Sequence, residues 1–186
     1  MKDNNLKPIV KWVGGKRQLI SKLMEYKPDT FNKYYEPFIG GGAFLFALRP
    51  NDFVINDHNK ELINMYKVVK NSTNELLEIL KKHQENNTKE YYLEIRALDR
   101  EPKKFAKMSD IERAARLIYM LKVDFNGLYR VNKRGQFNVP YEGGNLTFLM
   151  VDIKILKLLM KILCLQQKNF SIIQKMKLLA VTLKKL

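Results

Sequence analysis

The stretch Glu36-Pro37-Phe38-Ile39-Gly40-Gly41-Gly42-Ala43 decides how the rest of the chain is interpreted. An extended aromatic run, Phe31 to Tyr35, precedes it, and a helix-compatible apolar run, Ala43 to Leu48, follows it. A strand, a glycine turn and a helix start make a nucleotide-cofactor site, because glycine permits positive φ and a helix N-terminus offers unpaired N–H groups. The spacing is not Gly-x-Gly-x-x-Gly, so the triplet alone indicates an ordinary tight turn more often than a cofactor loop.

An acidic residue, Asp57, follows the glycine turn at the end of the next predicted strand. The run Phe53-Val54-Ile55-Asn56-Asp57 is a short β-branched and aromatic segment that ends in an acid. In nucleotide-binding α/β folds an acid at the end of the second strand, about 20 residues after the glycine turn, accepts hydrogen bonds from ribose hydroxyls. Asp57 is also placed to act as a helix N-cap, because a helical pattern begins at Asn59-Lys60-Glu61-Leu62. Both roles can hold at once.

Several motifs occur together in a fixed order along the chain. They are Lys11-Trp12-Val13-Gly14-Gly15-Lys16, Glu36 to Gly42, Ile55-Asn56-Asp57, Asn126-Gly127-Leu128-Tyr129-Arg130 and Phe137-Asn138-Val139-Pro140. The set resembles the Dam-type, GATC-recognising D12 class of adenine-N6 DNA methyltransferases, from Lys7 to about Tyr141. The resemblance implies an α/β fold with a Rossmann-like sheet, S-adenosylmethionine as cofactor and double-stranded DNA as partner. The implied reaction is methyl transfer to adenine N6, with GATC as the expected target.

The resemblance also assigns candidate cofactor-binding residues. They are Trp12, Lys16, Pro37, Phe38, Gly40, Gly42 and Asp57. For a lone tryptophan, core packing is the usual alternative. For Lys16 the alternative is a solvated helix start, although a cation near the positive end of a helix dipole is unfavourable, which favours a ligand role.

The segment from residue 61 to 145 is expected to read DNA. Helical spacing runs through most of it, and Ser109-Asp110-Ile111-Glu112 is a capping-box pattern. Two alternating arms, Leu128 to Asn132 and Gln136 to Val139, then predict a hairpin in which basic and aromatic side chains are interleaved. The resemblance makes DNA-binding candidates of Phe125, Asn126, Leu128, Arg130 and Pro140. Arg130 is the best candidate base reader, because arginine bonds guanine O6 and N7, and Phe125 the wedge or stacking residue. A solvated basic hairpin is the alternative.

The last segment, residues 146–186, breaks the pattern. It contains no Gly or Pro, and Asp152 is its only acid against eight lysines. The family would next supply more strands and an Asp-Pro-Pro-Tyr motif, which this sequence lacks, so no catalytic residue is assigned. We expect residues 1–60 to be the cofactor part, 61–145 the recognition region and 146–186 an aberrant tail from an out-of-frame reading. The C-terminal half of the sheet is then missing. The leading interpretation is a truncated adenine-N6 methyltransferase, and the alternative is a non-catalytic DNA-binding remnant.

The composition limits the partners and the compartment that the chain can have. The 186 residues carry 34 Lys and Arg against 19 Asp and Glu, a net charge of +15, which favours a polyanion such as DNA, RNA or an anionic membrane surface. A cationic tail helix on a membrane is therefore a third possibility. With one cysteine and no Cys/His cluster, neither a disulfide nor a metal is expected. No apolar run of about 18 residues predicts a spanning helix, and the N-terminus is polar, so a reducing cytoplasm is the expected compartment.

Overall fold

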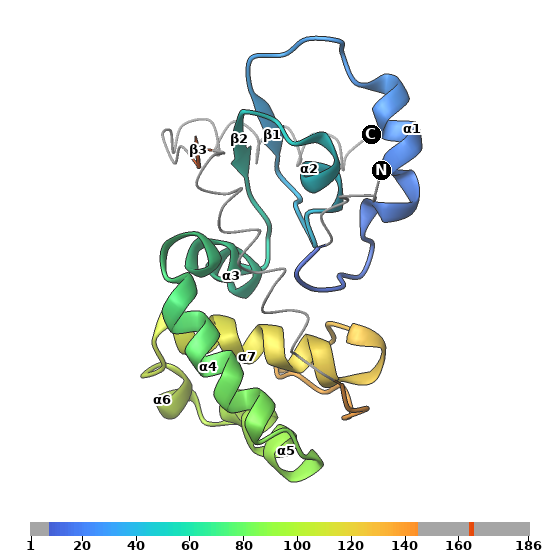
Figure 1. Ribbon diagram of the computed structural model, residues 1–186. Helices are drawn as coiled ribbons and strands as arrows, with labels where there is room; N and C mark the ends of the chain where they lie inside the picture. Colours follow the sequence, from blue (N-terminus) through green and yellow to red (C-terminus); the bar gives the residue numbers. More distant parts are fainter. Residues whose placement is uncertain (1–7, 145–163, 166–186) are drawn as a thin grey trace.

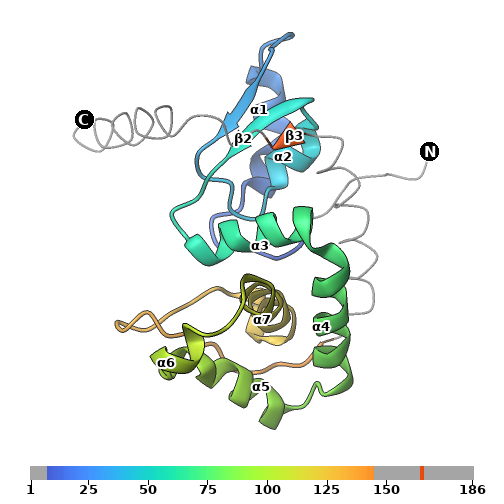
Figure 2. The same ribbon diagram turned by 90° about the vertical axis from the view of Figure 1, so that its left-hand side faces the viewer.

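The computed structural model describes residues 8–144 and the strand at 164–165, and it places a small sheet beside a group of helices (Figure 1). In Figure 2, α3 lies between the sheet on one side and α7 on the other. The elements are η1 (Lys16–Leu19), α1 (Ile20–Tyr26), β1 (Tyr34–Glu36), α2 (Ala43–Leu48), β2 (Asp52–Ile55), α3 (Lys60–Asn71), α4 (Thr73–Glu85), α5 (Lys89–Ala97), η2 (Leu98–Arg100), α6 (Pro102–Phe105), α7 (Asp110–Val123), η3 (Phe125–Gly127) and β3 (Cys164–Leu165).

The sheet is parallel, in the order β1-β2-β3. Tyr34 pairs with Phe53 and Glu36 with Ile55. The pairing continues past the strands, because Asn56 N–H donates to the Glu36 carbonyl at 2.9 Å. The expected strand–turn–helix–strand unit is therefore present, and the carboxyl ends of β1 and β2 meet where the glycine turn begins. This is the edge at which open parallel sheets bind ligands.

The second strand has a neighbour on each side. Its residues Asp52 and Phe53 pair with Cys164 and Leu165 of β3. The tail segment therefore adds a two-residue strand beside β2, which the sequence analysis did not predict. The strand β3 could not be predicted from its lysine-rich surroundings, because two extended residues are enough to pair with the edge of β2 and leave no sequence pattern. The remainder of 145–186, including the expected membrane-surface helix, lies outside the described residues.

The helix starts follow the capping chemistry of the sequence. The expected capping box is confirmed, because Ser109 and Glu112 exchange side-chain and backbone hydrogen bonds at the start of α7. The helix after β2 is capped by Asn59, whose Oδ1 accepts the N–H groups of Glu61 and Leu62. The N-cap interpretation of Asp57 is therefore wrong. Asn59, two residues later, accepts the free N–H groups of the first helical turn instead.

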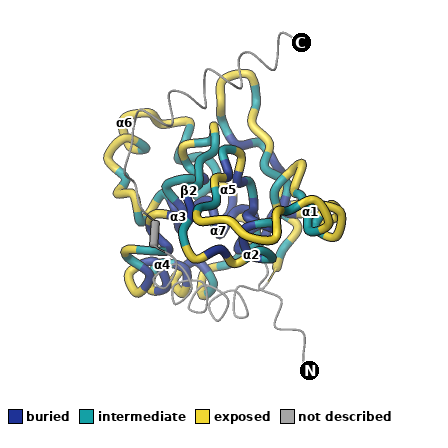
Figure 3. The backbone as a smooth tube through the Cα atoms, turned by 90° about the horizontal axis from the view of Figure 1, so that it is seen from above, coloured by how far each residue is buried: buried dark blue, intermediate teal, exposed yellow. Residues whose placement is uncertain are grey.

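One apolar core joins the sheet and the helices. Figure 3 shows buried backbone gathered around α7, β2 and α2, and exposed backbone at α6 and α1. Tyr66, Tyr92 and Tyr119 are fully buried. The helix α7 contributes a long run of buried residues to this core, from Ala114 to Leu121 and again at Val123. No helix among residues 8–144 is long and apolar enough to cross a membrane.

Candidate functional site

The glycine turn and the acid after β2 meet directly. Gly40 N–H donates to Asp57 Oδ2 at 2.9 Å, and its carbonyl accepts the Tyr66 hydroxyl at 2.8 Å. Gly40 has φ +53° and Gly42 has φ +78°, which are conformations that glycine adopts without strain. The turn is therefore held in one shape at the carboxyl ends of β1 and β2.

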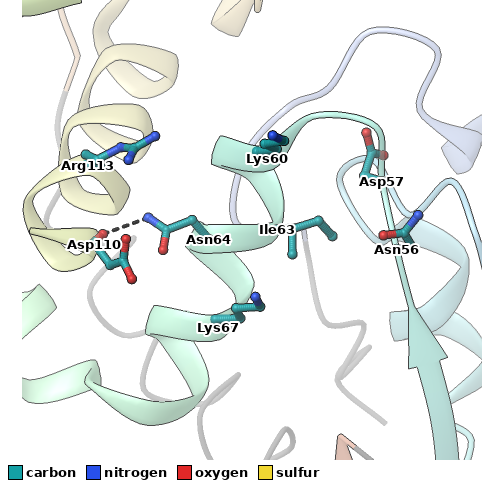
Figure 4. Close-up of a pocket in the computed structure, with 8 residues that line it drawn as sticks. All are labelled: Asn56, Asp57, Lys60, Ile63, Asn64, Lys67, Asp110 and Arg113. Carbon is teal, nitrogen blue, oxygen red and sulfur yellow. Dashed lines mark hydrogen bonds between the residues drawn. The ribbon is translucent and has the colours of Figure 1, made fainter. Parts of the chain in front are cut away.

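Asp57 keeps acceptor capacity for a ligand. Its Oδ1 accepts Asn59 N–H at 3.0 Å, and its Oδ2 accepts Gly40 N–H. Each ionised carboxylate oxygen can accept about two hydrogen bonds, so each has capacity for one more. Beside it lies a pocket of about 360 Å³ between the N-terminal turns of α3 and α7, drawn in Figure 4. The pocket is lined by Asn56, Asp57, Lys60, Ile63, Asn64, Lys67, Asp110 and Arg113.

Lys16 is not a simple solvated residue. Its Nζ lies 3.1 Å from Glu36 Oε1 and also donates to the Phe38 carbonyl. The Glu36 side chain is almost fully buried at the end of β1. Burial raises the pKa of this carboxyl above its ordinary value, while the Lys16 ammonium opposes the shift. Lys16 therefore ties the first helical turn to the glycine turn through a buried acid.

The glycines of the turn are required by the chain's own aromatic side chains. A Cβ at Gly40 would lie 3.2 Å from Trp12 Cδ1. A Cβ at Gly42 would lie 2.8 Å from Phe46 Cε2 and 2.9 Å from the Tyr66 hydroxyl. Phe38 instead points outward, with 58% of its surface exposed. The candidate cofactor residues thus surround one turn, with Trp12 above Gly40 and an exposed ring beside it.

The basic hairpin is a β-ribbon held along one arm by side chains. Its arms are joined by the bridge Val131–Phe137 and by Asn138 N–H to the Arg130 carbonyl at 3.2 Å. The anchors come from the helical region. Tyr92 and Arg96 both donate to the Val139 carbonyl, Arg100 donates to the Phe137 carbonyl, and Asp99 accepts Phe137 N–H at 2.7 Å. Side chains of α5 and η2 thus satisfy backbone groups that would otherwise form an open edge.

The predicted DNA-binding residues lie at one end of this ribbon. Phe125 N–H donates to the Pro140 carbonyl at 3.0 Å, and the Phe125 ring is 50% exposed. Asn126 has φ +60° and donates its N–H to Glu142. Leu128 is half-buried. Arg130 reaches across the ribbon to the Asn138 side chain and carbonyl, which uses only part of its donor set.

A buried acid sets the turn between α7 and the ribbon. Asp124 is 2% exposed, and its Oδ1 accepts Leu128 N–H at 3.1 Å. Its Oδ2 has no hydrogen-bond partner among the described residues. Burial raises the pKa of Asp124 to about 7, and the Leu128 and Gly127 N–H groups limit the rise. Sequence reasoning did not identify this residue.

Sequence reasoning also missed the side chains that hold the two sites in place. Tyr66 fits a core position by helical spacing, which concealed its hydroxyl contact with Gly40. Asp99 and Arg116 form an ion pair at 2.9 Å, and both are largely buried. A buried pair of opposite charges brought together by the fold leaves no local pattern. No group of three or more metal-ligating side chains occurs among the residues that the structure describes.

The chain matches a family described as D12 class N6 adenine-specific DNA methyltransferase over residues 12–178. This confirms the family resemblance and extends it beyond Tyr141, where the motifs end. The out-of-frame origin of residues 146–186 stays a prediction, as does recognition of GATC.

Characterised relatives carry related descriptions. A Type II methyltransferase of Lactococcus lactis subsp. cremoris is 56% identical over 137 residues, which are 74% of this chain and 48% of the relative. A Type II methyltransferase of Methanocaldococcus jannaschii is 41% identical, over 73% of this chain and 52% of the relative. A DNA adenine methylase of Vibrio cholerae is 35% identical, over 71% of this chain and 46% of the relative. The chain spans about half the length of these relatives.

Proposed function

This chain belongs to the D12 class of N6 adenine-specific DNA methyltransferases, and from that premise we propose that it binds S-adenosylmethionine at the glycine turn and duplex DNA at the β-ribbon, for methylation of adenine N6. The observation that carries the proposal is the hydrogen bond between Gly40 N–H and Asp57 Oδ2. It brings the turn and the acid together at the carboxyl ends of two parallel strands, where nucleotide cofactors bind.

The residues at this turn fit the proposed cofactor. Asp57 has one acceptor position left on each oxygen, which suits the two hydroxyls of a ribose. Trp12 and the exposed Phe38 ring offer aromatic surface to a purine or to a sulfonium cation. S-adenosylmethionine, when bound, supplies an electrophilic methyl group. The protein's part is then mainly orientation of that methyl group toward the adenine nitrogen.

The ribbon is the proposed DNA-reading element. Arg130 is exposed and keeps donors beyond those bound to Asn138, so it can approach guanine O6 and N7 in the major groove. Phe125, exposed at the adjacent turn, is placed to support a base leaving the stack. Asn126, Leu128 and Pro140 line the same end. We propose GATC as the target because these positions match the motif of the family's GATC-recognising members.

A second candidate function rests on one sequence fact. The Asp-Pro-Pro-Tyr motif, which would hold the adenine amino group, does not occur in these 186 residues. The donor-binding and DNA-reading parts can therefore act without methyl transfer, as a DNA-binding remnant. Under either function the proposed division of labour is the same: residues 1–60 hold the donor and 61–145 read DNA.

One experiment separates the two functions. The chain is incubated with S-adenosylmethionine carrying a radiolabelled methyl group and with duplexes that contain either GATC or a scrambled site. Label in the GATC duplex supports the methyltransferase. Retention of the GATC duplex without label supports the remnant, and equal retention of both duplexes contradicts sequence reading by the ribbon.

A further inference from the structure

The tryptophan beside the glycine turn also contacts the ribbon. The Trp12 ring stacks on the Tyr129 ring, with centroids 4.7 Å apart and planes 26° from parallel. Trp12 also lies against Gly40, where an added Cβ would come within 3.2 Å of Trp12 Cδ1 and would push the ring aside. Lys11, one residue earlier, packs against Gly127 in the turn before the ribbon. The segment Lys11-Trp12 therefore lies between the proposed donor site and the proposed DNA site.

Both partners of the Trp12–Tyr129 stack contact residues that are held in place by further bonds. Tyr129 packs edge-on against Phe137 at 5.8 Å, and Phe137 is 2% exposed and clamped to Asp99 through its backbone. At the other end, Gly40 is bonded to Asp57 and to the Tyr66 hydroxyl. Rings that are in direct contact and anchored at both ends can pass a displacement from one to the next, because closely packed groups transmit strain.

We propose that Trp12 and Tyr129 are a positioning pair that couples the two sites, so that a bound methyl donor strengthens DNA binding and bound DNA strengthens donor binding. The proposal rests on the proposed function and goes beyond it. A donor that contacts Trp12 over the glycine turn restricts the ring on one face, and the stacked Tyr129 then restricts the ribbon arm that carries Leu128 and Arg130. Linkage requires the effect to be equal in both directions.

The chain contains one tryptophan, so its fluorescence reports this ring alone. A GATC duplex is titrated into the full chain without and with saturating S-adenosylhomocysteine, which cannot transfer a methyl group. We expect the analogue to raise duplex affinity at least about fivefold, within the usual range for coupled sites. The reverse titration must give the same factor.

Variants at residue 129 test the pair itself. Tyr129→Leu removes the ring, and we expect the coupling factor to fall to about one while affinity for the analogue alone stays within about twofold. Tyr129→Phe keeps the ring and keeps the coupling. Tyr26→Leu, at an exposed aromatic of α1, is the matched control and behaves as the original chain. If Tyr129→Leu does not fold, Tyr129→Met replaces it.

The outcomes separate this inference from the proposed function. Binding of both ligands with a coupling factor of one in the original chain overturns the coupling and leaves the function standing. A factor that survives in Tyr129→Leu, or a loss of both affinities with the factor unchanged, also overturns it and assigns Tyr129 a merely structural role. Failure to bind either ligand overturns the proposed function, and the coupling with it.

Discussion

The glycine turn and the β-ribbon keep their backbone in place by opposite means. In the turn, aromatic side chains cover the glycines that set the backbone curvature, and the backbone of Gly40 bonds Asp57 and the Tyr66 hydroxyl. In the ribbon, extended arms with few bonds of their own are clamped by side chains of α5 and η2. The turn therefore tolerates no added atom, whereas the ribbon tolerates added atoms and depends on polar partners.

This difference assigns different weaknesses to the two regions. Steric substitutions should damage the turn far more than the ribbon. Removal of a charge should damage the ribbon mount, which consists of Tyr92, Arg96, Asp99, Arg100 and Arg116, far more than removal of a charge on the exposed surface nearby.

Removal of Asp99, the acid of the ribbon mount, should destabilise the protein more than any other change proposed here. Asp99→Ala leaves Arg116 buried without its carboxylate and Phe137 N–H without its acceptor. Breaking a buried pair by removing one partner costs about 3–5 kcal/mol, and we expect a loss of that size in the free energy of unfolding. Urea denaturation followed by circular dichroism measures it.

Glu101→Ala is the matched control, because its pair with Lys104 is exposed and should contribute less than about 1 kcal/mol. Similar losses in the free energy of unfolding for the two variants would show that the buried Asp99 contributes no more to stability than an exposed acid.

The glycine turn should fail when a methyl group is added. Gly42→Ala combines a positive φ with contacts of 2.8 and 2.9 Å to Phe46 and Tyr66. Left-handed strain and overpacking together should lower the free energy of unfolding by about 3 kcal/mol. Thermal melting provides the measurement, and the variant should also lose donor binding.

The ribbon supplies the control for this variant. Gly135 has nearly the same φ, +75°, but nothing lies within 4 Å of an added Cβ. Gly135→Ala should therefore show strain alone, about 1 kcal/mol. An equal loss at both positions would mean that packing around Gly42 does not matter.

The buried acid at the start of the ribbon should make stability depend on pH. The pKa of Asp124 is raised to about 7 in the folded protein, so the folded state binds more protons than the unfolded state between about pH 4 and pH 7. The stabilisation is complete below about pH 4 and is lost as the pH rises to about 7.

Asp124→Asn keeps an acceptor for Leu128 N–H and removes this titration. Relative to the original chain, it should gain at least about 2 kcal/mol between pH 4 and pH 8, against a linkage limit of about 4 kcal/mol for about three pKa units, measured by denaturant unfolding at both values. Glu78→Gln changes the net charge equally on an exposed face of α4 and should show no such gain. A pH-independent difference for Asp124→Asn contradicts the assignment.

The smallest effect concerns α7, which ends directly before the turn that leads into the ribbon. Ser109→Ala removes the cap of α7 and should cost about 1 kcal/mol in the free energy of unfolding. Ser72→Ala is the control, because Ser72 makes no side-chain cap bond at the start of α4 and its loss should stay within about 0.5 kcal/mol. Equal losses would show that the capping box contributes nothing beyond helix propensity.

The contrast also explains what the sequence could predict. The strand–turn–helix unit, the capping box and the ribbon were all predictable, because each depends on residues that are near neighbours in the chain. The Asp99–Arg116 pair, the Tyr66 contact with Gly40 and the Trp12–Tyr129 stack were not, because their partners are distant in sequence and carry no periodic signal. The short strand β3 was hidden for a different reason: its residues sit in a lysine-rich pattern that resembles a helix.

The most direct test of the central claim is calorimetric titration of the original chain and of Asp57→Asn with S-adenosylhomocysteine. The amide can still accept a hydrogen bond from the turn, but it loses acceptor capacity on one side. We expect saturable binding to the original chain and at least about tenfold weaker binding to the variant, with both chains folded and binding GATC duplex similarly in the absence of the analogue. Equal affinity of the two chains for the analogue would contradict the claim that the glycine turn and Asp57 hold the methyl donor.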